Sequence, residues 1–151
     1  MRIDLGALGL RGGERHECAY VVEVEPIVLG GAEYQVYLPE GAMIAVDRVA
    51  GGYVVKLAVD GKVYGPCSRC LREVEMPLHA EQEEFAPTAA GGWTESETCV
   101  HVEDLVVDVP ALVREALVLA LPPQMVCSVS CKGLCPECGE DLNEGPCACK
   151  A

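Results

Sequence analysis

Eight of the ten cysteines occur as four closely spaced pairs, an arrangement typical of protein metal sites. Zn²⁺ prefers four nitrogen or sulfur ligands in a tetrahedron, and two cysteines separated by two residues can reach one ion from a tight turn. The stretch Cys135-Pro-Glu-Cys138-Gly has this form, because Pro136 fixes one backbone dihedral angle and Gly139 permits a sharp turn. The first predicted zinc site combines this pair with the next one along the chain: Cys135, Cys138, Cys147 and Cys149.

The remaining two pairs predict a second zinc site: Cys67, Cys70, Cys127 and Cys131. Because these two pairs lie far apart in the sequence, a shared ion would clamp the tail onto the body of the protein. Four thiolates leave no position open for water, so both sites are expected to be structural rather than catalytic. The division of the cysteines stays open, since Cys131 could replace Cys135 and one site could be empty.

Two other uses of these cysteines are disfavoured. A disulfide framework requires an oxidising compartment, and residues 1–6 begin no apolar secretory segment, so we expect a cytoplasmic protein. A redox-active pair usually has its first thiol at the N-terminus of a helix. Cys67 instead follows Gly65-Pro66 and precedes an alternating, strand-like stretch. Metal binding is therefore the preferred interpretation.

The charge of the chain indicates a class of partner. Its net charge is −13, from 24 acidic and 11 basic residues, and residues 73–108 contain ten acidic residues and no lysine or arginine. Such a surface repels nucleic-acid phosphates and suits a basic protein, although an acidic surface also serves simple solubility. Residues 127–149 carry one lysine, Lys132, against four acidic residues, which is the reverse of an RNA-binding zinc ribbon.

Alternating apolar and polar residues predict that much of the chain is β-strand. After a short first strand and a loop in residues 1–16, we expect strands near residues 17–25, 33–38, 43–49, 53–59 and 73–79. Asp60-Gly61 is either a hairpin turn or a bulge in one long strand that runs to Tyr64. Cys67 and Cys70 are then expected at the tip of an antiparallel hairpin. Cys18 is expected to face the core.

One helix completes the predicted fold. Asp108 is a candidate N-cap and Pro110 fits the first turn. Residues 109–121 are apolar nearly all round, which predicts a buried helix, and Pro122-Pro123 end it. The expected fold class is α+β: a mostly antiparallel β-sheet or barrel-like body with this helix at residues 1–123, and a cysteine-rich, zinc-ribbon-like tail at residues 124–151 clamped to the body.

Two other stretches between the hairpin and the helix contain residues that could bind a partner or a metal ion. Residues 86–98 have loop composition, and Trp93 within them is either an anchor for a partner or locally packed. Cys99 and His101 share one strand face, but a third metal site there is disfavoured.

The chain has no phosphate-binding loop, nucleophile elbow or paired-histidine helix, so we expect no enzyme activity. Charged residues and a proline interrupt residues 105–121, the longest apolar stretch, so no membrane span is predicted.

Several motifs together resemble one known family. They are Cys67-Ser-Arg-Cys70-Leu, then Arg114-Glu115 leading to Leu119-Ala-Leu-Pro122, then the run from Cys131-Lys-Gly-Leu-Cys135 through Cys138-Gly-Glu-Asp-Leu-Asn143, and finally Cys147-Ala-Cys149. Over about residues 51–149 the chain is similar to the YceD-like proteins of bacteria and plastids, which are named for large-ribosomal-RNA-subunit accumulation. The resemblance implies a cytoplasmic, non-enzymatic factor in making the large ribosomal subunit. Some members lack the tail cysteines, which implies that a tail metal only stabilises.

Two functional hypotheses from different classes remain. In the first, the protein is a factor for large ribosomal subunit biogenesis and ribosomal RNA accumulation whose acidic body binds a basic ribosomal protein or a pre-subunit particle. In the alternative, it is a zinc-ribbon module that contacts RNA through its tail, with Arg69, Arg72 and Lys132 as a candidate basic spot. A redox or zinc-storage protein is a third, less favoured interpretation. The acidic tail favours the first hypothesis.

Overall fold

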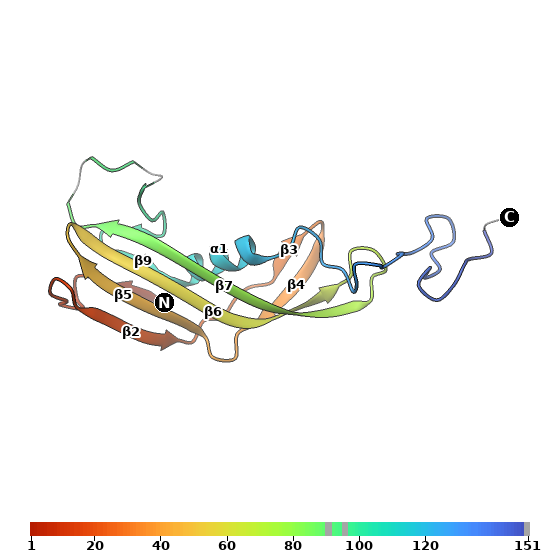
Figure 1. Ribbon diagram of the computed structural model, residues 1–151, viewed down its shortest axis with the longest axis horizontal. Coiled ribbons are helices and arrows are strands. Elements are labelled where there is room, and N and C mark those ends of the chain that lie inside the picture. The colour runs from red at the N-terminus through yellow and green to blue at the C-terminus, as the bar shows by residue number, and fades with distance from the viewer. Residues whose placement is uncertain (90–91, 95–96, 150–151) are drawn as a thin grey trace. The chain divides into compact units, whose positions relative to one another are not determined.

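The computed structural model describes residues 1–89, 92–94 and 97–149. Four residues of the predicted loop, 90, 91, 95 and 96, lie outside the described part of the chain. The elements are labelled in Figure 1, and in chain order they are β1 (Arg2–Asp4), β2 (Arg15–Tyr20), β3 (Ile27–Leu29), β4 (Ala32–Tyr37), β5 (Ala42–Val49), β6 (Gly52–Pro66), β7 (Glu73–Pro87), β8 (Val102–Glu103), β9 (Val106–Asp108) and α1 (Val109–Ala120).

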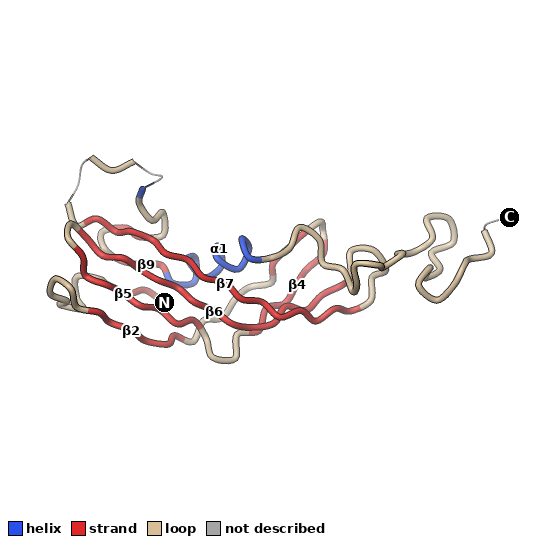
Figure 2. The backbone as a smooth tube through the Cα atoms, in the orientation of Figure 1, coloured by secondary structure: helices blue, strands red, loops and turns tan. Residues whose placement is uncertain are grey.

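Most of the strands form one sheet with antiparallel pairing, as predicted. The hydrogen-bonded order is β2-β5-β6-β4-β3, and β7 pairs with β6 as well. This order does not close on itself, so the barrel-like alternative is wrong and the sheet is open (Figure 2). A smaller sheet has the order β1-β9-β8. In the described part of the chain, the fold is therefore a mostly antiparallel β-structure with one α-helix, α1, after the last strand.

The chain forms two compact units that alternate along the sequence. The first contains Met1–Val24, Leu38–Gly61 and Leu78–Leu121, and the second contains Glu25–Tyr37, Lys62–Pro77 and Pro122–Ala151. The predicted boundary at residue 123 thus lies next to the point where the chain enters the tail. The unit that includes the tail also includes β3, β4 and the tip of the β6–β7 hairpin, which the predicted division had placed in the body.

Helix α1 belongs to the first unit and begins where the sequence predicts. The Asp108 carboxylate accepts a hydrogen bond from the backbone N–H of Ala111, at 3.1 Å, as an N-cap does. One face of the helix is buried, through Val109, Leu112, Val113, Ala116 and Leu117. Val118 and Leu119 are exposed, so the helix that the sequence predicts to be buried is buried on one face only. Apolar composition alone could not show that one side of the helix is exposed.

Strand β6 resolves the ambiguity at Asp60-Gly61, because it runs unbroken through both residues to Pro66. Its buried residues Val55, Leu57, Val59 and Val63 all occupy odd-numbered positions. Alternate residues of a strand point to the same face, so one face of β6 is buried on both sides of Asp60-Gly61. Cys18 corrects another expectation, since it is exposed on β2. Strand β2 is an edge strand of the sheet, and the alternating pattern that suggested a core cysteine does not reveal whether a second layer covers that face.

The second unit contains a hairpin that the sequence analysis missed. Strands β3 and β4 pair through Leu29 and Ala32, and the turn between them is Gly30-Gly31, with φ of 57° and 83°. Two glycines with positive φ suit the tight turn of a two-residue hairpin, so the signal was present in the sequence. Tyr34 on β4 is buried, and its hydroxyl donates to the carbonyl of Pro66 at 2.9 Å. This bond fixes the end of β6 immediately before Cys67.

Two further observations complete the fold. Trp93 stacks against Phe85, with ring centroids 4.9 Å apart and planes tilted by 58°, so it is locally packed although its side chain is half exposed. In the part of the chain that the structure describes, no helix combines the length and apolar character needed to cross a membrane.

Candidate metal centres

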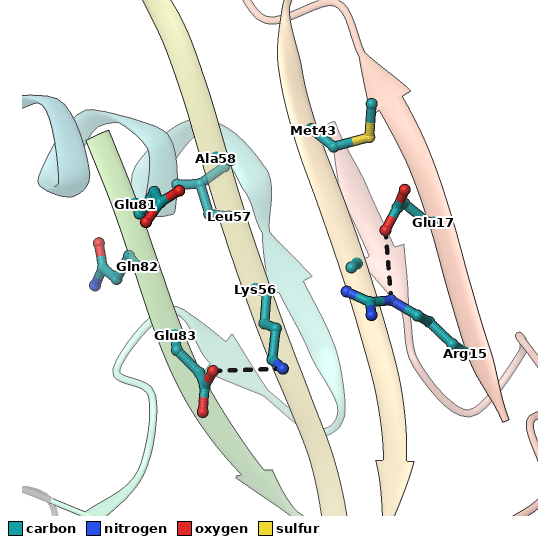
Figure 3. Close-up of a pocket in the computed structure, with 10 residues that line it drawn as sticks. Arg15, Glu17, Met43, Lys56, Leu57, Ala58, Glu81, Gln82 and Glu83 are labelled. Carbon is teal, nitrogen blue, oxygen red and sulfur yellow. Dashed lines mark ion pairs between the residues drawn. The ribbon is translucent and has the colours of Figure 1, made fainter. Parts of the chain in front are cut away.

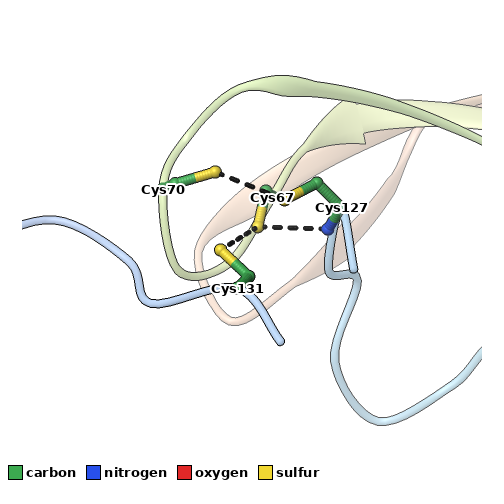
Figure 4. A group of neighbouring side chains, drawn as sticks. All are labelled: Cys67, Cys70, Cys127 and Cys131. Carbon is green, nitrogen blue, oxygen red and sulfur yellow. Dashed lines mark hydrogen bonds between the residues drawn. The ribbon is translucent and has the colours of Figure 1, made fainter. Parts of the chain in front are cut away.

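The structure brings the eight paired cysteines together as two sets of four. Within each set, all four sulfur atoms lie within 4.8 Å of one another. The sets are the predicted ones: Cys67, Cys70, Cys127 and Cys131 form the hairpin site, and Cys135, Cys138, Cys147 and Cys149 form the tail site. Figure 4 shows the hairpin site, where the β6–β7 turn meets two segments of the tail. Both sites lie within the second unit.

Backbone groups of the β6–β7 turn and of the tail form hydrogen bonds with Cys67. The Cys67 N–H donates to the carbonyl of Arg72 at 2.7 Å, and its sulfur accepts N–H bonds from Arg69 at 3.4 Å and Cys127 at 3.3 Å. Burial acts to raise the pKa of this thiol, but N–H groups of Cys70, Arg69 and Cys127 outweigh it and lower the pKa to about 6. The chain thus favours a thiolate at Cys67.

A small apolar cluster encloses the hairpin site. Cys67, Cys70 and Cys131 are buried together with Val74, while Val126 and Leu134 pack against them; Cys127 is exposed. The tail reaches this cluster through two backbone bonds, Ser68 N–H to the carbonyl of Met125 at 2.7 Å and Leu134 N–H to that of Arg69 at 3.1 Å. The hairpin and tail are therefore in contact through backbone hydrogen bonds as well as through their sulfur atoms.

The tail site repeats the turn geometry of the hairpin site. The Cys135 N–H donates to the carbonyl of Glu140 at 2.8 Å, and the Gly139 N–H donates to the carbonyl of Cys135 at 2.9 Å. N–H groups of Cys138 and Glu137 donate to the Cys135 sulfur and lower its pKa to about 6. Cys135 and Cys147 are buried, whereas Cys138 and Cys149 are exposed. The tail site is thus local in sequence and more open to solvent than the hairpin site.

Residues 67–72 and 135–140 are two copies of one turn. In each, the first cysteine donates to a carbonyl five residues later and accepts, through its own carbonyl, an N–H from four residues later. In each, the fifth residue has a left-handed backbone: Leu71 with φ of 62° and Gly139 with φ of 76°. Glycine adopts this conformation freely, whereas leucine does so at a cost of about 1 kcal/mol. The hairpin turn therefore keeps a strained, exposed leucine where the tail turn has glycine.

Asn143 and Arg72 connect the two sites through contacts that the sequence did not predict. Asn143, between the cysteine pairs of the tail site, donates from Nδ2 to the Cys131 sulfur at 3.4 Å and lowers the pKa of that thiol. Its Oδ1 accepts from the backbone N–H of Lys132 at 2.8 Å. Arg72 pairs with Asp141 at 2.6 Å and with Glu144 at 2.9 Å. Cysteine spacing could not reveal these contacts, because each involves a side chain that is not itself a cysteine ligand.

We expect Asn143→Ala to weaken metal binding at the hairpin site by about tenfold, because groups that hydrogen-bond to a ligand orient it and tune its charge. The tail site should keep its affinity, since its four ligands do not depend on this amide. Titration of the metal-free protein with Co²⁺, followed through thiolate charge-transfer absorption, measures both affinities against a competing chelator. Equal weakening of both sites would show that Asn143 acts on the tail as a whole.

The sulfur positions match a tetrahedral ion. Sulfur–sulfur distances are 3.9 Å for Cys67 and Cys131, 3.6 Å for Cys70 and Cys127, and 3.4 Å for Cys135 and Cys147. Zn–S bonds of about 2.3 Å give a tetrahedron with edges of about 3.8 Å, whereas a disulfide bond is about 2.05 Å long. Both sets of ligands therefore fit one tetrahedral ion each, and four thiolates are the donor set of zinc and iron sites.

The other candidate residues do not join these sets. Cys99 is buried, and burial raises the pKa of its thiol to about 11. His101 is hydrogen-bonded through Nε2 to the Glu115 carboxylate at 2.7 Å. Among the described residues, neither belongs to a group of side chains that could hold an ion. The disfavoured third metal site is accordingly not assembled in the described part of the chain.

Comparison with known proteins places these sites in a family. Residues 55–151 match the model described as large ribosomal RNA subunit accumulation protein YceD, a span that includes all eight clustered cysteines. Proteins of Mycobacterium bovis and Mycobacterium tuberculosis, described as uncharacterized, are 29% identical over 153 residues, covering 97% of this chain and 72% of theirs. An uncharacterized protein of Mycobacterium leprae is 28% identical over 102 residues, 66% of this chain and 47% of its own. No solved structure matches significantly. The chain therefore belongs to the YceD family of large ribosomal RNA subunit accumulation proteins.

Proposed function

We propose that the protein is a non-enzymatic cytoplasmic factor for large ribosomal subunit biogenesis and ribosomal RNA accumulation. The observation that carries the proposal is the family match, which spans the hairpin, the helix and both cysteine sets. We propose further that each set holds one structural Zn²⁺. The ion in the hairpin site would fasten the tail to the β6–β7 turn, and the ion in the tail site would order the terminal loop.

The proposed partner is a basic ribosomal protein or a pre-subunit particle that presents one. Support comes from β7, where exposed acids alternate with buried residues: Glu73, Glu75, Glu81 and Glu83 lie on the solvent side. Figure 3 shows part of this outer face, a groove of about 430 Å³ in which Lys56 pairs with Glu83 at 3.6 Å and Arg15 pairs with Glu17 at 3.4 Å. These pairs neutralise part of the charge on this face. Glu81, whose side chain is 73% exposed, pairs with His79 and has no lysine or arginine partner in the groove.

The alternative, a zinc ribbon that contacts RNA, receives less support from the tail. Arg69 donates from Nη1 to the carbonyl of Cys131 at 3.1 Å, and Arg72 pairs with two acidic residues of the tail. The basic spot envisaged from the sequence is thus used largely for contacts within the second unit. RNA-binding surfaces need cationic side chains that are available to phosphates, and this requirement favours the protein-binding hypothesis.

Depletion of the protein from cells is expected to lower the ratio of large-subunit to small-subunit ribosomal RNA. Tagged protein should co-purify with basic large-subunit proteins, identified by mass spectrometry before and after nuclease treatment. Capture that persists after nuclease treatment supports direct protein binding. An unchanged RNA ratio together with an absence of large-subunit proteins in the purified material would contradict the proposed function.

A further inference from the structure

Strand β7 has an unpaired edge that lies beside helix α1. Among the described residues β7 pairs with β6 alone, so the backbone groups along its other edge have no strand partner. A groove of about 490 Å³ follows this edge and lies wholly within the first unit. We call it the edge groove; its lining residues are His79, Ala80, Glu81, Gln82, Glu84, Ala116, Leu119 and Ala120. An unpaired strand edge is a template for another extended chain.

The helix side of the edge groove is apolar. Leu119 is 73% exposed, and the other helix residues of the lining are the alanines 116 and 120. Small side chains next to one large exposed leucine leave space for an incoming apolar side chain. This arrangement indicates that the groove receives an apolar side chain on the face towards α1.

The strand side of the edge groove is acidic. Glu81 lies on the outer face of β7, whereas its neighbour Ala80 is buried on the opposite face. Glu84 adds a second carboxylate on β7, and it accepts a hydrogen bond from the Gln82 amide at 2.5 Å. No lysine or arginine lines the groove among the described residues. The groove therefore attracts cationic side chains through complementary charge.

We propose that an extended, basic segment of the protein partner adds to β7 as a further strand, with apolar side chains on Leu119 and cationic side chains on Glu81. The inference rests on the proposed binding of a basic protein and assigns the place where it occurs. An added strand turns alternate side chains to the two faces of a sheet, so the segment must alternate basic and apolar residues. RNA cannot supply the N–H and C=O ladder that this edge requires.

A synthetic peptide of about twelve residues that alternates lysine and valine tests the proposal on the full chain, with a peptide of equal composition but separate lysine and valine blocks as control. Binding is followed by fluorescence anisotropy, and amide hydrogen exchange identifies the protected residues. We expect the alternating peptide to bind about tenfold more tightly than the block peptide and to slow exchange at residues 79–84, because only the alternating peptide matches both faces.

Two helix variants locate the contact. Leu119→Lys should weaken binding of the alternating peptide by about tenfold, because it removes the apolar contact from the groove. Val118→Lys is the matched control, since Val118 is an exposed neighbour on α1 that does not line the groove, and it should leave affinity unchanged. Both positions are exposed, so thermal melting should show the same stability for each variant.

Equal effects of the two helix variants, or peptide binding without protection of residues 79–84, would overturn the proposal. Dimerisation that protects the same amides without peptide would assign the edge to a second copy of the chain and would overturn it as well. The proposed function is judged separately by capture of large-subunit proteins from cells. Capture that Leu119→Lys retains would reject this site and keep the function, whereas failure of the wild type to capture them would reject the function.

Discussion

Replacing Cys67 with serine is expected to release the tail from the hairpin and to halve the metal content. The wild type should purify with about two Zn²⁺ per chain and the variant with about one, because the hairpin site loses a ligand that is fully buried and bonded to three N–H groups. Structural zinc contributes on the order of 10 kcal/mol of apparent folding free energy. Cleavage between residues 123 and 131 by a broad-specificity protease should therefore accelerate by at least about a hundredfold.

Cys147→Ser is the matched control, because it removes one ligand from the tail site instead. It should also lower the zinc content to about one ion, but only the loop from residue 135 onward should become sensitive to protease. Elemental analysis and mass spectrometry of the fragments measure both properties. Equal protection of residues 123–131 in the wild type and Cys67→Ser would show that the hairpin cysteines do not hold the tail. Zinc below half an equivalent in the wild type, with all thiols titratable, would reject both sites.

Reversing three acidic charges on β7 is expected to abolish capture of the basic ribosomal protein. The triple variant Glu81→Lys, Glu83→Lys and Glu84→Lys replaces attraction by repulsion along both faces of the strand and raises the net charge by six units from −13. Its affinity for RNA should rise if it changes at all, because three cations approach phosphates. Capture is measured by quantitative mass spectrometry of material purified from cells, and RNA affinity by filter binding.

A control with the same total charge separates local from general electrostatics. Glu23→Lys, Glu33→Lys and Glu40→Lys change three exposed glutamates outside residues 73–108 and should retain the partner. Thermal melting is needed for the β7 variant, because Glu83 pairs with Lys56 and the reversal places two lysines together. If the β7 variant keeps its protein partners while changes at Arg69, Arg72 and Lys132 remove ribosomal RNA, the acidic strand is a solvated face and the tail is the RNA contact.

The cysteine sets could be predicted from sequence because short spacing and turn residues determine which sulfur atoms can meet. Two cysteines separated by two residues can meet in one local turn. Once the two pairs of the tail site are assigned to each other, one pair remains that can complete the hairpin site. The supporting bonds from Asn143 and Arg72 could not be predicted, since cysteine spacing gives no information about which polar side chains reach the sulfur atoms and the turns around them. Their positions depend on how the tail folds over the hairpin, which no local pattern specifies.

Features of the fold that depend only on residues adjacent in sequence could be predicted. Asp108 and Pro110 mark the start of α1, because capping depends on adjacent residues. The errors concern neighbouring elements: Cys18 alternates like a core residue but lies exposed on an edge strand, and Leu119 is apolar but lies exposed on a helix face that no described element covers. Periodicity shows that an element has two faces, but burial depends on the elements that pack against each face. The missed β3–β4 hairpin is different, since Gly30-Gly31 carried the signal.

The separation of the cysteines along the chain has a consequence for the order in which the sites form during synthesis. Cys135 and Cys147 are 12 residues apart, whereas Cys67 and Cys131 are 64 apart. Closing the longer loop costs about 1.5 kcal/mol more chain entropy, but the β6–β7 hairpin can form before the tail exists and place Cys67 beside Cys70 in advance. Until Cys127 and Cys131 are made, the hairpin thus presents only two of the four candidate ligands, and an ion bound there could exchange with small thiols. A Zn²⁺ ion bound as proposed would become committed to the hairpin only when the tail arrives.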